Sequence, residues 1–120
     1  MNIHIIDKKL SNKDVLNIAI ENFGDNADMV KGVADLGRNK IALGGELHAD
    51  AEQVLLEDGS EQKDLWGFNL YPKEPSDKRV KYTSFINIRP NDGNRSIEVQ
   101  SEELCKKIRE IIKMWVELDD

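Results

Sequence analysis

The chain of 120 residues lacks several features that define whole classes of protein. It has a single cysteine, Cys105, so no intramolecular disulfide and no cysteine-based metal cluster can form within one chain. It also has no internal repeat and no low-complexity tract, which excludes repeat architectures. These absences leave an ordinary globular domain as the expected class.

Long hydrophobic runs are missing as well. A membrane-spanning helix needs roughly 20 consecutive apolar residues, and the most apolar helical stretch, residues 104–118, is interrupted by lysine, arginine and glutamate. The first residues carry neither the basic region nor the long apolar region of a secretory signal. We therefore expect a cytoplasmic protein that does not enter a membrane.

Positive charge is in the minority, because 17 Lys and Arg face 23 Asp and Glu, giving a net charge of −6. This balance opposes the neutralisation of phosphates by which proteins bind nucleic acid, so a nucleic-acid partner is not expected. The 39% of hydrophobic residues is too high for a disordered chain. Scaling of surface with mass predicts burial of about two-thirds of the unfolded surface, enough for one core, so we expect one domain over residues 1–120.

Hydrophobic spacing and turn residues predict eight main elements in the order β-α-β-β-α-β-β-α. This order predicts an α+β fold, a mainly antiparallel sheet of about five strands with three helices on one face. Three residues have the type and spacing of helix N-caps: Ser11, Asp50 and Ser101. The expected strands are residues 3–6, 29–36, 40–43, 66–71 and 80–89, with a further short strand at 97–99, and the expected helices are residues 11–24, 51–57 and 101 onward.

The densest polar cluster follows a double glycine and comprises Glu46, His48 and Asp50. If this segment is extended, the three side chains project to one side, because alternate residues of a strand share a face. Two carboxylates and an imidazole could then bind a divalent metal, or His48 could act as a general acid or base. The structural alternative is that Asp50 caps a helix, Glu46 is a solvated charge and His48 bonds the backbone.

A second cluster surrounds a glycine-containing loop, where Arg89, Asn94 and Arg95 follow Asn87. Backbone N–H groups and guanidinium groups of such a loop can hold a carboxylate or phosphate. The spacing matches no nucleotide-binding loop. The alternative is that the arginines pair with acidic residues and the Asn side chains stabilise a turn.

A third segment leads from a polar loop into an expected strand through Asp64 and Trp66. Trp66 could supply a stacking surface for a ligand. Strand alternation places it beside other apolar side chains, so a position in the core is the alternative.

The motifs GGELHAD at residues 44–50, LLEDGSEQKDLWG at 55–67 and INIRPNDGNRS at 86–96 together resemble a family of short prokaryotic proteins that is known only as a domain of unknown function. The resemblance covers residues 5–112. It implies a small intracellular prokaryotic protein. It transfers no activity and no catalytic residue.

Three functions remain open from the sequence. The first is a domain that binds a small ligand or a protein partner through one polar site, with ligand contacts at Glu46, Asp64, Trp66, Asn87, Asn94 and Arg95 and with His48 and Arg89 at its centre. The second is a small hydrolase or ribonuclease-like enzyme, in which His48 is the acid or base and Arg89 or Arg95 stabilises negative charge. The third is an interaction module, including a homodimer, built on the C-terminal helix.

Overall fold

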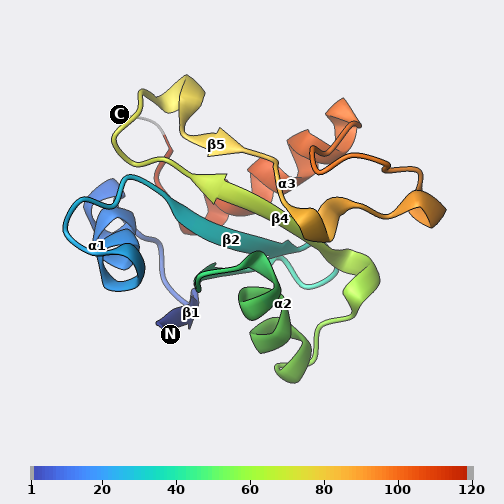
Figure 1. Ribbon diagram of the computed structural model, residues 1–120, viewed down its shortest axis with the longest axis horizontal. Helices are drawn as coiled ribbons and strands as arrows, with labels where there is room; N and C mark the ends of the chain where they lie inside the picture. The colour runs from blue at the N-terminus through green and yellow to red at the C-terminus, as the bar shows by residue number, and fades with distance from the viewer. Residues whose placement is uncertain (1, 119–120) are drawn as a thin grey trace.

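The computed structural model describes residues 2–118 and has a five-stranded antiparallel sheet at its centre (Figure 1). The strand order is β1-β3-β2-β4-β5, so the hairpin of β2 and β3 lies inside the sheet. The α+β class and the antiparallel pairing predicted from the sequence are therefore confirmed. The strands are β1 (Ile3–Ile5), β2 (Val30–Asp35), β3 (Lys40–Gly44), β4 (Leu65–Leu70) and β5 (Val80–Lys81).

Three helices cover this sheet on both faces, which differs from the expected single covered face. One core contains the buried side chains of α1 and α3 with alternate residues of β2, β3 and β4. A second, smaller core joins α2 to the other face of the same strands, and Figure 1 shows α2 and α3 on opposite sides of the sheet. The helices are α1 (Asn12–Phe23), α2 (His48–Glu57) and α3 (Glu102–Trp115).

The ends of α1 and α3 form as local sequence chemistry predicts. The Ser11 hydroxyl accepts a hydrogen bond from the N–H of Asp14, and the Asp14 carboxylate accepts one from the N–H of Ser11. The Ser101 hydroxyl likewise accepts from the N–H of Leu104. These caps satisfy N–H groups that the first helical turn leaves without partners.

The chain after β5 differs most from expectation. Residues 80–89 alternate as a strand would, but the strand ends at Lys81, and the 3-10 turns η3 (Phe85–Asn87) and η4 (Pro90–Asp92) follow. Instead of a backbone ladder, the side chain of Asn87 bonds β4: its Oδ1 accepts from the N–H of Gly67 at 2.8 Å, and its Nδ2 donates to the Gly67 carbonyl at 3.0 Å. An amide side chain thus replaces the strand that alternation predicted. Residues 97–99 add one isolated bridge, between Thr83 and Glu98.

The LLEDGS motif takes part in a network of charged and polar side chains around the buried Asp35, which joins the β2–β3 turn to the end of α2. Asp35, fully buried, accepts hydrogen bonds from the Nε of Arg38 and from the hydroxyl of Ser60. Arg38 also donates to the carboxylate of Asp58 at 3.0 Å. The polar residues Asp58 and Ser60 of this motif therefore have a structural role. In the part of the chain that is described, no helix has the length and apolarity that a membrane crossing requires.

Candidate functional site

The GGELHAD segment forms the turn from β3 into α2. Gly44 and Gly45 both adopt positive φ, at 116° and 92°, and a Cβ at Gly44 would lie 2.1 Å from the carbonyl oxygen of Asn2. Helix α2 begins three residues earlier than predicted, with Leu47 at the N-cap. Asp50 is consequently the third residue of the helix, and its carboxylate accepts a hydrogen bond from the N–H of Leu47 at 3.0 Å. The sequence identified the capping function of Asp50 but placed it at the wrong position.

His48, the first residue of α2, lies against β4. Its Nε2 is 2.8 Å from the carbonyl oxygen of Phe68. Because a carbonyl can only accept, Nε2 must carry the proton, and in the neutral ring Nδ1 is then the free acceptor. A Cβ at Gly67 would lie 3.2 Å from the ring carbon Cδ2, so the absence of a side chain at Gly67 allows the ring to approach the strand.

The neutral form of this imidazole is favoured. Burial lowers the pKa of His48 below its ordinary value of 6.5, and the positive charge of Lys31 lowers the pKa further. The hydrogen bond to Phe68 and the polar side chain of Asn69 partly oppose these effects. At neutral pH His48 is therefore a fixed, uncharged imidazole that can accept a proton or a hydrogen bond at Nδ1.

Two lysines lie on the strands to either side of β4, and the charge of one of them, Lys31, acts on this imidazole. Lys31 in β2 pairs with Asn69 in β4, and Asn69 pairs with Lys81 in β5, so the three side chains share the face that α2 partly covers. The Nζ of Lys31 donates to the carbonyl of Glu46 at 2.6 Å, and the Nζ of Lys81 lies 5.0 Å from the ring centre of Tyr71. We call Lys31, His48, Asn69 and Lys81 the His48 shelf.

Several polar groups of the His48 shelf lack an ion-pair or hydrogen-bond partner within residues 2–118. Within residues 2–118, neither of its two lysines has an ion pair with a carboxylate, although the chain has six more acidic than basic side chains. The Oδ1 of Asn69 is buried and has no hydrogen-bond donor there, while the Nδ2 of Asn69 donates to the carbonyl of Thr83 at 3.1 Å. A buried acceptor without a donor costs about 1–3 kcal/mol. The shelf thus has two cations, an acceptor at Nδ1 of His48 and a second, buried acceptor at Oδ1 of Asn69.

The proposed metal cluster does not assemble in the described residues. Glu46 is exposed, and Asp50 is used at the start of α2. Residues 46 and 50 lie on either side of the strand-to-helix change, so the alternation that would align them with His48 is absent. No group of three or more His, Cys, Asp or Glu side chains in residues 2–118 is arranged to hold a metal ion.

The INIRPNDGNRS segment is held together by its own polar side chains. Asn94, 4% exposed, donates through Nδ2 to the carbonyls of Asn87, Ser96 and Glu98, and its Oδ1 accepts from the N–H of Gln100. Asn87 is fully buried against Gly67, as described above. Both asparagines therefore use their hydrogen-bonding groups inside the chain. Ligand contact through them stays a prediction.

Arg89 and Trp66 contact one another rather than open space. The guanidinium of Arg89 lies 3.7 Å from the ring centre of Trp66, and it donates to the carbonyls of Gln62 and Leu65. Trp66 is 6% exposed and belongs to the larger core, which confirms the structural alternative for its position. One N–H of Arg89, at Nε, lacks a hydrogen bond in the described chain and lies 3.8 Å from the carboxylate of Asp92.

The remaining predicted residues lie at the edges of this region. Asp64 is half-buried just before β4 and contacts Lys63 at 3.3 Å, and Arg95 is exposed. The three residues predicted to share one site therefore lie along β4. Asp64 directly precedes the strand, Arg89 bonds the carbonyl of Leu65, and His48 bonds the carbonyl of Phe68. Whether one ligand contacts all three stays a prediction. Lys31, Asn69 and Lys81 were not predicted from the sequence, although a lysine and an asparagine inside apolar runs were a usable signal.

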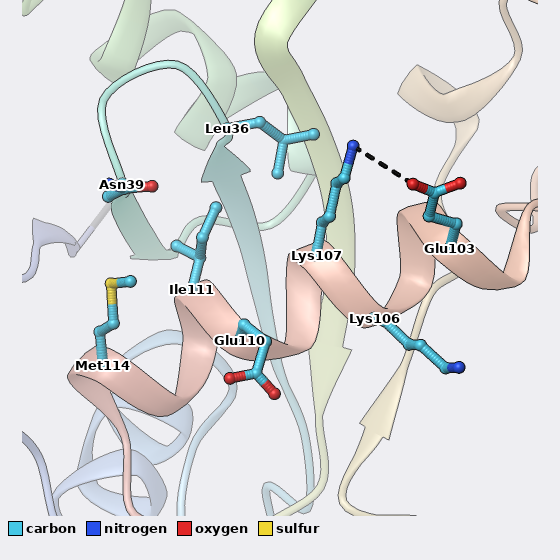
Figure 2. A pocket seen from close by; sticks show the side chains of 8 residues that line it. All are labelled: Leu36, Asn39, Glu103, Lys106, Lys107, Glu110, Ile111 and Met114. Atoms are coloured by element: carbon cyan, nitrogen blue, oxygen red, sulfur yellow. Dashed lines mark ion pairs between the residues drawn. The ribbon is translucent and has the colours of Figure 1, made fainter.

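A second candidate region is a groove of about 550 Å³ between α3 and the β2–β3 turn (Figure 2). The apolar stripe of α3, including Ile108 and Ile112, packs on this chain's own sheet, so it is not the partner surface considered from the sequence. What remains outside is a charged face with Met114, which is 51% exposed. In Figure 2 Ile111 and Met114 point toward the turn, while Lys106 and Glu110 point away from it.

The lowered pKa of His48 gives a prediction about stability. Because the folded state disfavours the protonated ring, the contribution of His48 is complete above its unfolded pKa and is lost as the pH falls through the lower folded pKa. We expect His48→Gln, which can still donate to Phe68, to reduce the loss of unfolding free energy between about pH 7 and about pH 5. Urea unfolding at both pH values measures this. An unchanged pH dependence would contradict the assignment, and His4→Gln, at the exposed histidine, is the control.

Comparison with known proteins identifies a family for this chain but assigns it no activity. Searches of the curated proteins and of the solved structures gave no match. A family model described as a protein of unknown function (DUF5674) matches residues 4–115. This match confirms the resemblance seen in the sequence motifs. The chain belongs to the DUF5674 family.

Proposed function

We propose that this protein is a ligand-binding domain, and that the His48 shelf binds a small anion that also carries a hydroxyl group. The observation that carries the proposal is the pairing of two lysines that lack carboxylate partners with two acceptors that lack donors. A carboxylate or phosphate group would complement the lysines. A hydroxyl group would complement Nδ1 of His48.

The framework around the His48 shelf supports this assignment. Binding sites need side chains held by packing and by surrounding hydrogen bonds. A hydrogen bond to the Phe68 carbonyl holds His48 in place. The neighbouring Gly67 is held by hydrogen bonds to the side chain of Asn87. In this proposal the INIRPNDGNRS segment contributes to binding by holding β4, and the GGELHAD segment contributes His48 itself.

The test is a thermal-shift titration with four probes: acetate, glycolate, inorganic phosphate and glycerol 3-phosphate. A ligand at 100 times its Kd stabilises the folded state by about 2.7 kcal/mol, which corresponds to a rise in Tm of about 8–12 °C for a domain of this size. We expect the hydroxylated anions to produce the larger shifts. Lys31→Met and His48→Gln should each remove most of the shift.

Lys9→Met is the matched control, because Lys9 is an exposed lysine in a loop outside the His48 shelf. It should leave the shift unchanged. The proposal is wrong if none of the probes stabilises the protein, or if Lys9→Met weakens binding as much as Lys31→Met does.

One observation favours a second candidate, the small hydrolase. His48 is neutral at neutral pH, and its Nδ1 is free to remove a proton from a bound hydroxyl or water. Hydrolysis of phosphate or carboxylate esters, measured with wild type and His48→Gln, tests this candidate. Turnover that is equal in the two proteins would exclude His48 as the base.

A further inference from the structure

The outer face of α3 carries charges in an alternating order. From the N-terminal end the order is acidic, basic, acidic, basic, and all four side chains are exposed. Because successive helical residues turn by about 100°, the four fall within an arc of about 80° on one side of the helix. We call these residues the α3 charge stripe: Glu103, Lys106, Glu110 and Lys113.

The order of this stripe is self-complementary in an antiparallel arrangement. Glu103 and Lys113 are equally distant in sequence from Ile108, and so are Lys106 and Glu110. A twofold axis at the level of Ile108 would therefore bring each acidic residue opposite a basic residue of a second α3. All four contacts between the two helices would be attractive, and in a parallel arrangement they would be repulsive.

We infer that this face of α3 binds a second copy of the same chain, with the two α3 helices antiparallel about a twofold axis near Ile108. In this dimer Glu103 faces the partner's Lys113, and Lys106 faces the partner's Glu110. The contact is isologous, so the same surface serves on both chains and the assembly closes at two.

The rest of the surface favours this place for self-association. Each chain has a net charge of −6, so two copies repel one another over most of their surface. The α3 charge stripe is neutral as a whole and permits close approach. Beside it, Met114 and the groove floor of Leu36 and Ile111 supply apolar surface for burial (Figure 2).

Ion pairs within the helix leave these charges available. Glu103 and Lys107 are 3.8 Å apart, and Glu110 and Lys113 are 4.0 Å apart, with all four side chains between 44% and 83% exposed. Exposed pairs one turn apart on a helix interact weakly. Contact with a second helix would remove water from the stripe and add a partner for each charge.

The test uses two charge-reversed variants of the full chain. The acidic variant carries Lys106→Glu and Lys113→Glu, and the basic variant carries Glu103→Lys and Glu110→Lys. Lys9→Glu with Lys73→Glu is the control, since it changes two exposed loop lysines and shifts the net charge as the acidic variant does. Sedimentation velocity over a range of concentrations and salt measures association, and circular dichroism confirms that each variant is folded.

We expect the wild type to dimerise, with a Kd that rises with salt as the charges are screened. Each variant alone should raise the Kd at least about tenfold, because like charges then face one another. An equal mixture of the two variants should form a heterodimer. The inference is overturned if the wild type is monomeric at every concentration, if the control dissociates as strongly as the acidic variant, or if the mixture does not associate.

Discussion

Asn87→Ala is expected to destabilise the protein by about 3–4 kcal/mol, with a fall in Tm of about 10–15 °C. The substitution leaves the N–H and the carbonyl of Gly67 without partners inside the protein, and it also removes the bond to the carbonyl of Ile97. Asn87 is fully buried, so water cannot easily replace these bonds. Thermal and urea unfolding of the variant measure the effect.

Asn91→Ala is the matched control, because Asn91 is an exposed asparagine in η4. It should change the unfolding free energy by less than about 0.5 kcal/mol. Equal stability of Asn87→Ala and wild type would show that Asn87 does not replace a strand on β4. A loss of stability shared equally by both variants would point to the loop as a whole.

Gly67→Ala is the second substitution with a large expected effect. A Cβ at this position would lie 2.5 Å from the Cβ of Ser84, 2.7 Å from its hydroxyl oxygen and 3.2 Å from the ring of His48. The backbone of Ser84 must then move away from β4, which costs about 2–4 kcal/mol. We expect reduced stability together with a displaced His48 ring, and urea unfolding and the chemical shifts of His48 report these two effects.

A double variant separates this steric mechanism from a general weakening of β4. Ser84→Gly removes the side chain that the new Cβ meets, so Gly67→Ala with Ser84→Gly should be more stable than the sum of the two single effects predicts. Additive effects would contradict close contact between residues 67 and 84. The comparison uses the unfolding free energies of the four proteins.

Features that depend on a few consecutive residues could be predicted from the sequence. The caps at Ser11 and Ser101 formed as expected, because a hydroxyl and the N–H groups three residues later interact within one turn. The hairpin of β2 and β3 was equally local. The start of α2 was misplaced by three residues because Asp50 can cap the same turn from inside the helix.

Features that depend on distant contacts could not be predicted. Residues 82–89 alternate like a strand, but they bind β4 through the Asn87 side chain, and alternation carries no information about such a partner. The face of the sheet that each helix covers depends on its packing against strands that are distant in the sequence. The residues of the His48 shelf could be predicted only in part for the same reason. His48 was visible in a motif, whereas Lys31, Asn69 and Lys81 come together only through strand register.

The motifs on which the resemblance rested also show why polar residues in a short sequence motif need not touch a ligand. Asn87, Asn94 and Arg89 fit the description of a binding loop, yet their side chains mainly bond backbone groups of this chain. A buried polar side chain that replaces backbone pairing is as hard to substitute as a ligand contact. Stability measurements therefore have to accompany every binding measurement on these residues.

The most direct test of the ligand-binding account is a titration of isotopically labelled protein with glycerol 3-phosphate, followed by NMR. The account predicts that the largest shift changes occur at Lys31, His48, Asn69 and Lys81, and that the Nδ1 resonance of His48 moves as it accepts a hydrogen bond. Changes confined to the loop around Asn91 and Arg95, or no changes at all with a protein that is folded, would contradict it.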